Sequence, residues 1–154
     1  EDKAATETNY GKYQLNLLYQ KAYAHGQSIT TQFNSQYSST NYLPSSEQFY
    51  IGGAYSVRGY EESMLSGDHG YSLNLDYSVP LTKGAAAYIF MDYGSVHGAS
   101  AFDDHILWGT GIGIKANVGK NIYTNVTLGI PLIREVNGTE VSKTRIHFML
   151  NGQF

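Results

Sequence analysis

One arginine stands in a setting that needs a chemical explanation. Arg58 occurs in the run Ser56-Val57-Arg58-Gly59-Tyr60, inside a polar stretch over residues 39–68. That stretch is too long for a hairpin turn, and loops longer than about 12–15 residues are usually either functional or disordered. A guanidinium offers planar, two-pronged recognition of a carboxylate. On these grounds, both an ordinary exposed surface loop and a functional loop around Arg58 remain open.

The other reactive side chains form no catalytic or metal site. The five histidines stand at positions 25, 69, 97, 105 and 147, and no two of them have metal-ligand spacing on one predicted element. Because the sequence has no cysteine, a disulfide scaffold, a zinc–thiolate site and a thiol nucleophile are excluded. Residues 109–113, Gly-Thr-Gly-Ile-Gly, lack the strand–turn–helix setting of a phosphate loop and are interpreted as a strand. We therefore predict no enzyme, no cofactor and no metal.

The composition favours a membrane over nucleic acid. Only 15% of the residues are charged, against about 25% in an average soluble domain. The net charge is −3 and no run of basic residues occurs, so the chain has no positive electrostatic field that would attract nucleic acid. No stretch approaches the roughly 18 apolar residues of a membrane helix, since the longest nearly apolar window, residues 84–91, ends at Asp92. The remaining membrane signature is the β-strand of about ten alternating residues.

This alternation occurs in seven segments. Side chains at every second position share one face of a strand, so a period of two predicts β-structure. The predicted strands cover residues 13–20, 28–37, 71–81, 85–94, 106–118, 122–132 and 143–154. Short turns at 25–27, 82–84 and 120–121 alternate with long connections at 39–68, 97–105 and 134–140. Short turns on one side and long loops on the other are typical of outer-membrane barrels.

The fold class follows from strand length and strand number. A soluble β-sandwich also alternates apolar and polar residues, but its strands are usually about 5–6 residues long, about half the length predicted here. We therefore predict an all-β, antiparallel transmembrane β-barrel. Seven strands are an odd number, and an open barrel edge in lipid would leave backbone groups unpaired. Residues 1–154 are accordingly predicted to be the C-terminal part of a longer barrel.

The alternation also predicts which side chains face the lumen. Asp92 shares a face with Tyr88 and Gly94, opposite the apolar side chains of its strand, so Asp92 should point inward. The glycines of residues 109–113 should also face the lumen, where they either make room for the loop or mark strand curvature. The opposite face carries the aromatic residues expected to contact lipid: Tyr13, Tyr19, Tyr71, Tyr77, Tyr93, Trp108, Phe148 and Phe154.

Several motifs resemble those of the two-partner secretion transporters of the Omp85 superfamily. Residues 43–49, Leu-Pro-Ser-Ser-Glu-Gln-Phe, followed by Val57-Arg58-Gly59-Tyr60, resemble the sixth-loop signature of that family. Phe90-Met91-Asp92-Tyr93-Gly94 resembles its F-x-D-x-G strand element. The strand before it is also similar, with Asp76 at a position where the family more often has Glu. Phe154, on an amphipathic last strand, resembles the signal read by the barrel-assembly machinery.

This resemblance implies a specific arrangement and function. The chain from about residue 10 would form the last seven strands of a sixteen-stranded barrel, without the periplasmic POTRA domains of the family. The loop 39–68 would fold into the lumen, where Arg58 would pair with Asp92. The implied function is export of a large exoprotein (adhesin, haemolysin or contact-dependent toxin) across the Gram-negative outer membrane without nucleotide hydrolysis. The implied partners are that exoprotein, the bilayer with its lipopolysaccharide, and the assembly machinery, around a monomeric pore.

Three other functions remain open at this point. An Omp85 barrel that assembles outer-membrane proteins would share the arginine loop but would need a weak seam between its first and last strands. A small self-contained adhesive barrel would need an eighth strand within residues 1–9 and a disordered loop at 39–68. A secreted soluble sandwich enzyme would have inward apolar faces and a cleft lined by acids with perturbed pKa values.

Overall fold

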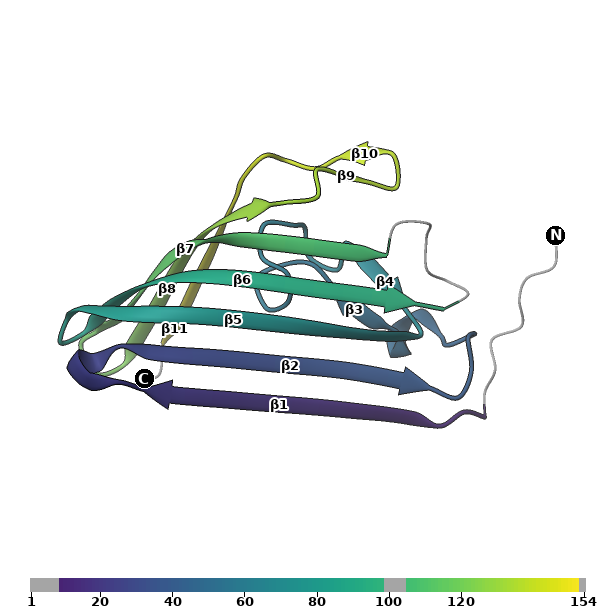
Figure 1. The fold of residues 1–154 in the computed structure, drawn as a ribbon, viewed down its shortest axis with the longest axis horizontal. Helices are drawn as coiled ribbons and strands as arrows, with labels where there is room; N and C mark the ends of the chain where they lie inside the picture. The colour runs from purple at the N-terminus through teal and green to yellow at the C-terminus, as the bar shows by residue number, and fades with distance from the viewer. Residues whose placement is uncertain (1–8, 99–104, 153–154) are drawn as a thin grey trace.

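A seven-stranded antiparallel sheet dominates the computed structural model, which describes residues 9–98 and 105–152 (Figure 1). The sheet order is β1-β2-β5-β6-β7-β8-β11. Its strands are β1 (Lys12–Ala22), β2 (Ser28–Ser38), β5 (His69–Thr82), β6 (Ala85–His97), β7 (Ile106–Val118), β8 (Ile122–Pro131) and β11 (Arg145–Gly152). All seven predicted strands are confirmed, and each pairs with the next along the chain. Among the described strands, β1 and β11 form the two edges and do not pair with each other.

Smaller elements lie in the connections. The long segment between β2 and β5 contains the 3-10 turn η2 (Ser45–Glu47) and a small hairpin of β3 (Phe49–Ile51) and β4 (Leu65–Gly67). A second small hairpin joins β9 (Glu135–Val136) to β10 (Thr139–Glu140), and the 3-10 turn η1 (Ala24–Gly26) connects β1 to β2. Neither small hairpin was predicted, because three- and two-residue strands are too short to show an alternation.

The two faces of the sheet have opposite character. Ile112 and Phe148 are 57% and 67% exposed on the outer face, whereas Phe90 is only 3% exposed on the inner face. An outer face of exposed apolar side chains is what a lipid environment requires, whereas a soluble sandwich would expose polar side chains there, so the sandwich hypothesis is wrong. Within the described part of the chain, no helix has the length and apolar character needed to cross a membrane.

An aromatic row runs across the outer face near the long connections. The rings of Phe33, Tyr71, Tyr93 and Trp108 follow one another on β2, β5, β6 and β7, with centroid separations of 6.4, 5.9 and 6.0 Å. Tyr93 is half-buried because its neighbours pack on both sides of its ring. Such rows of amphipathic rings are typical of the membrane–water interface of barrels.

The segment between β2 and β5, residues 39–68, folds against the inner face of the sheet. Figure 1 shows β3 and β4 lying behind the ribbon of β6 and β7. A buried apolar cluster joins this segment to the sheet and to the β9 hairpin: Ile51, Val57, Tyr60, Leu65, Val96, Leu107 and Val136. The segment is therefore folded around a core that it shares with the sheet, and the disordered loop required by the adhesive-barrel hypothesis is wrong. We call residues 39–68 the inner loop.

Candidate functional site

The wall of the site is built by two neighbouring strands. Alternation places Asn74 and Asp76 on the inner face of β5, and Phe90, Asp92 and Gly94 on the inner face of β6. The antiparallel register sets Asn74 opposite Asp92, and Asp76 opposite Phe90. Directly opposite residues lie within about 5.5 Å of each other. The strand pair therefore presents two carboxylates and an amide as one polar patch on the inner wall.

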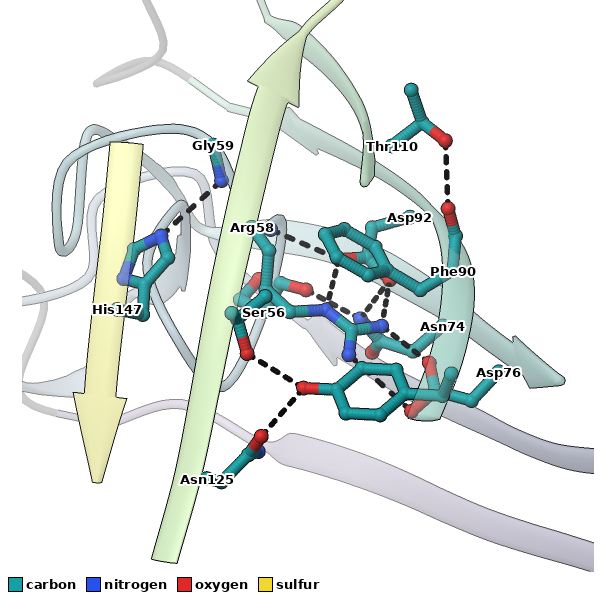
Figure 2. Close-up of polar contacts among 12 residues, drawn as sticks. Ser56, Arg58, Gly59, Asn74, Asp76, Phe90, Asp92, Thr110, Asn125 and His147 are labelled. Atoms are coloured by element: carbon teal, nitrogen blue, oxygen red, sulfur yellow. Dashed lines mark hydrogen bonds and ion pairs between the residues drawn. The ribbon is translucent and has the colours of Figure 1, made fainter. Parts of the chain in front are cut away.

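Arg58 of the inner loop lies on this patch. Its Nε donates to Asp92 Oδ2 at 2.7 Å and its Nη2 donates to Asp92 Oδ1 at 2.7 Å, which makes a two-pronged pair. Nη2 also donates to Asp76 Oδ1 at 2.5 Å, and Nη1 to Asp76 Oδ2 at 3.3 Å. Figure 2 shows the guanidinium held between the two carboxylates. The structure thus brings together three residues singled out in the sequence, with Asp76 as a full second acceptor.

Burial makes the contact of Arg58 with the two carboxylates energetically important. The Arg58 side chain is 9% exposed and that of Asp92 is 0% exposed, while Asp76 keeps 29% of its side chain accessible. Burial by itself would lower the pKa of Arg58, but the hydrogen bonds to Asp92 and Asp76 outweigh it and raise that pKa above its ordinary value. Arg58 is therefore always charged. Removing one member of a buried pair costs about 3–5 kcal/mol, because the other charge is left without compensation.

Asp92 receives further donors besides the guanidinium. The backbone N–H of Arg58 donates to Asp92 Oδ2 at 2.9 Å, and Asn74 Nδ2 donates to Asp92 Oδ1 at 2.8 Å. The same Asn74 amide donates to the Ser56 carbonyl of the inner loop. Asn74 thus links the wall carboxylate to the loop backbone. A fully buried carboxylate is stable only when donors saturate its oxygens, and Asp92 meets that requirement.

Phe90 and Gly94 shape the wall around the pair. The Arg58 Cζ atom lies 3.8 Å from the centroid of the Phe90 ring, within the range of a cation–π contact. A Cβ atom added to Gly94 would lie 2.9 Å from Val57 Cγ2 and 3.1 Å from Ile51 Cγ2. Spaced two apart, Phe90, Asp92 and Gly94 share the inner face. Phe90 stacks on the loop, Asp92 pairs with it and Gly94 makes room for it.

The other residues of the Val57–Tyr60 motif fasten the inner loop differently. Val57 is fully buried in the apolar cluster. Gly59 has a φ of 103°, and a Cβ atom there would lie 3.0 Å from the backbone nitrogen of Pro131, so this close approach to β8 requires glycine. The Tyr60 hydroxyl lies 2.8 Å from the Trp108 carbonyl oxygen and 3.0 Å from that of Ile133. Burial raises the pKa of Tyr60 above its ordinary value.

The inner-face glycines of β7 have two different neighbours. A Cβ atom on Gly109 would collide with the Arg58 carbonyl oxygen, so Gly109 does make room for the inner loop. Gly111 and Gly113 instead lie against the rings of Phe90 and Tyr88 on the adjacent strand. Only one of the three glycines therefore faces the loop, because the bulky rings of β6 lean over β7 and occupy the rest of the space.

Several residues at the site were not assigned a role from sequence. Asn74 could have been found from its polar-face alternation together with the pairing of the two strands. Gly129 of β8 and His147 of β11 also contact the inner loop, and the only signal for His147 was its place on the polar face of its strand. Phe154 lies outside the described residues. Within the residues that the structure describes, no group of histidine and acidic side chains could hold a metal ion.

The arrangement is suited to anchoring a loop rather than to making or breaking bonds. One permanently charged guanidinium is saturated by two carboxylates, and the carboxylates are occupied in turn by Arg58 and Asn74. A general acid or base would need a free lone pair or an exchangeable proton aimed at a substrate. The site holds residues 56–60 at one point on the inner wall.

Comparisons with known proteins show the family to which the chain belongs. Residues 1–116 match the family described as haemolysin secretion/activation protein ShlB/FhaC/HecB. The chain is 30% identical over 94 residues to an outer membrane transporter CdiB of Escherichia coli, covering 56% of this chain and 16% of that protein. A second transporter CdiB, from Escherichia coli strain 536, gives the same identity and coverage. The chain thus spans about a sixth of the length of these curated relatives.

A solved structure shares the fold. CdiB from Acinetobacter baumannii superposes with a TM-score of 0.72 at 24% identity, covering 92% of this chain and 26% of that one. That likeness shows a β-barrel fold, of which the open sheet described here is a part. The family match covers most of the sequence and includes the Arg58 loop and both wall strands. The chain therefore belongs to the haemolysin secretion/activation family of Gram-negative outer-membrane transporters.

Proposed function

We propose that this chain is the C-terminal part of the barrel of a translocator that exports a large partner exoprotein through its lumen. The exoprotein class is an adhesin, a haemolysin or a contact-dependent toxin, and export proceeds without nucleotide hydrolysis. The observation that carries the proposal is the match to the haemolysin secretion/activation family. The inner loop, folded on the concave face and anchored by Arg58 between Asp92 and Asp76, supports a role inside the lumen.

The geometry of the anchor supports a transport role in physical terms. The inner loop shares its apolar cluster with the sheet, and among the described residues its buried ionic contact is the one that joins Arg58 to the strands β5 and β6. A folded loop on the inner face must either leave room for a passing chain or move as a unit, and this contact fixes where residues 56–60 lie on the wall. The lumen motif Val57, Arg58, Gly59 and Tyr60 is thus proposed to hold the loop in a transport-competent position.

The proposed partners follow from the same assignment. They are the secreted exoprotein inside the lumen, the outer-membrane bilayer with its lipopolysaccharide around the outer face, and the barrel-assembly machinery during biogenesis. The proposed pore is monomeric. Nucleic acid is not a partner, because the net charge is −3 and no basic run occurs.

Export can be tested with the full-length transporter and a candidate partner exoprotein. The purified transporter is inserted into liposomes, and unfolded exoprotein is added outside without any nucleotide. We expect protease-protected exoprotein to accumulate inside in proportion to the inserted transporter. No protected exoprotein, with the barrel correctly inserted, would contradict the proposal. Loss of unrelated outer-membrane proteins from cells lacking the transporter would instead support the assembly hypothesis.

A further inference from the structure

The last strand of the sheet contacts the inner loop at two points. The backbone N–H of Gly59 donates to His147 Nε2 on β11 at 3.3 Å. Two residues farther along the loop, Glu61 Oε1 accepts from Arg145 Nη2 at 2.8 Å. Arg145 and His147 are spaced two apart, so both project from the same inner face of β11. Figure 2 shows the imidazole of His147 directed at Gly59.

A glycine on the intervening strand makes these contacts possible. Gly129 of β8 pairs with Arg145 in the sheet register. A Cβ atom at Gly129 would collide with the backbone of Gly59, and one at Gly59 would press on Ile130 and Pro131. The loop backbone therefore lies directly on β8, which is bare at this level. Only this close approach lets residues 59 and 61 reach across β8 to the side chains of β11.

These contacts are separate from the Arg58 anchor. Arg58 reaches β5 and β6, whereas Gly59 and Glu61 reach β11, and β7 and β8 lie between these two parts of the sheet. The loop therefore joins the pair β5 and β6 to β11, a strand that shares no hydrogen bonds with either of them. The Glu61–Arg145 pair is largely exposed, at 69% and 30% for the two side chains, and an exposed pair contributes little alone. Together with the Gly59–His147 bond, it defines the direction in which the loop leaves the anchor.

We propose that His147 and Arg145 are positioning residues that clasp the inner loop to the terminal strand. This terminal-strand clasp, formed by Gly59, Glu61, Arg145 and His147, holds the part of the loop after Arg58 against β8 and β11. When the clasp opens, residues 61–63 lose their attachment to β11, while Arg58 and Tyr60 stay bound to the wall. The position of the loop and the position of the last strand are thereby coupled. The relevance of this coupling to transport rests on the proposed function.

A spin-label distance can test the clasp in the full-length transporter. Labels are attached at Ser63→Cys, in the loop after the clasp, and Lys120→Cys, in the turn between β7 and β8, with any other cysteine replaced. The parent should show one narrow distance distribution. The variant R145Q/H147L should add a second distance population, because both attachments to β11 are lost. Lys143→Gln removes a basic charge two residues before Arg145 and should leave the distribution unchanged.

Two rescues distinguish positioning from general destabilisation. His147→Gln keeps a side-chain acceptor for the Gly59 N–H and should retain the single population. Exchanging the charges, with Glu61→Arg and Arg145→Glu together, should restore the parental distribution that Arg145→Glu alone disturbs. If R145Q/H147L does not insert into the membrane, the single variants Arg145→Gln and His147→Leu are compared in the same way.

An unchanged distribution in the variants that lack the clasp, with a clear change in Arg58→Ala, would overturn the proposal. A failure of the charge exchange to restore the distribution would also count against it. The distances are measured without exoprotein, so the clasp and the proposed export function can fail separately.

Discussion

Two arginines hold the inner loop through carboxylates, and the surroundings of the Arg58–Asp92 and Arg145–Glu61 pairs give these two pairs different strengths. The Nη2–Oδ1 distance of Arg58–Asp92 is 2.7 Å and the Nη2–Oε1 distance of Arg145–Glu61 is 2.8 Å, so geometry hardly separates them. Burial does, since Asp92 is 0% exposed and Glu61 is 69% exposed. Breaking a buried pair costs about 3–5 kcal/mol, whereas an exposed pair contributes about 0–1 kcal/mol. Arg58 is therefore the anchor, and Arg145 adjusts the orientation of the loop.

The first prediction concerns the anchor. Arg58→Ala and Asp92→Ala should each impair secretion, because each leaves the other charge buried without its partner. The double variant should be no worse than either single variant, since residues in direct contact are not additive. Arg58→Lys should not restore full function, because lysine lacks the fork that grips both oxygens of Asp92. The measurement is exoprotein in the medium, normalised to inserted barrel.

A matched control is Arg134→Ala, which removes an exposed arginine outside the inner loop and should secrete normally. Strictly additive losses in the double variant would mean that Arg58 and Asp92 act separately. Full secretion by both single variants would mean that secretion does not require the Arg58–Asp92 ion pair.

The second prediction concerns the space that Gly94 leaves for the inner loop. Gly94→Val should displace Val57 and Ile51, since even a Cβ atom there comes within 3.1 Å of both side chains. Overpacking of this kind costs about 1–3 kcal/mol. Because the displaced inner loop is more accessible, we expect a glutamate-specific protease to cleave the Gly94→Val variant faster than the parent after Glu61 and Glu62. The cleavage is measured by mass spectrometry. Gly11→Val is the control, because its nearest neighbours lie 3.7 Å or more away. Equal cleavage rates in the two variants would contradict this account of Gly94.

At the scale of the strands, alternation separates two environments on one element. On β6, Ile89 and Met91 are 58% and 48% exposed, whereas Tyr88, Phe90 and Asp92 between and beside them are buried. The period of two is strict, so a shift of one residue would place Asp92 in lipid and Ile89 against the inner loop. The cost of a charge in hydrocarbon holds the register.

The third prediction tests that register by cysteine labelling. Leu75→Cys, Ile112→Cys and Val126→Cys should resist a membrane-impermeant thiol reagent in intact membranes, because these positions are exposed only toward lipid. Gln32→Cys, on the inner face of β2, is the matched position that should react. Ready labelling at the three apolar positions would mean that the faces are reversed.

At the scale of the whole molecule, the inner loop joins parts of the sheet that are otherwise distant. Its Arg58 holds β5 and β6, Tyr60 reaches β7, and Gly59 lies on β8 and reaches β11. A curved sheet built only from neighbour-to-neighbour pairing can flex across its strands. A loop that contacts five of them on the inner face resists such flexing, so this segment braces the sheet.

The fourth prediction concerns biogenesis of the whole barrel. Phe154, beyond the described residues, is proposed as the assembly signal, so its deletion should lower the amount of barrel inserted. Secretion per inserted molecule should stay unchanged, because the inner loop and its wall are intact. Phe154→Trp keeps a terminal aromatic residue and should insert normally. The amounts are read from outer-membrane fractions, and normal levels after the deletion would rule out the signal.

Much of the fold could be predicted from sequence because its determinants are local. A period of two is a property of each strand alone, so the seven strands, their outward faces and the inward direction of Asp92 followed from residue order. The turns and long connections were equally visible from composition. The small β3–β4 hairpin was not, because three-residue strands carry no period and form only where the loop packs on Val96 and Leu107.

The tertiary structure alone decided how the site is assembled. Arg58 and Asp92 are 34 positions apart, so the sequence leaves no local trace of their contact, and Asp76 and Asn74 join it only because β5 pairs with β6 in one register. The contacts of His147 and Arg145 depend on the loop lying on the bare backbone of Gly129. Periodicity encodes which way a side chain points, but which distant segment meets it depends on how closely two backbones can approach.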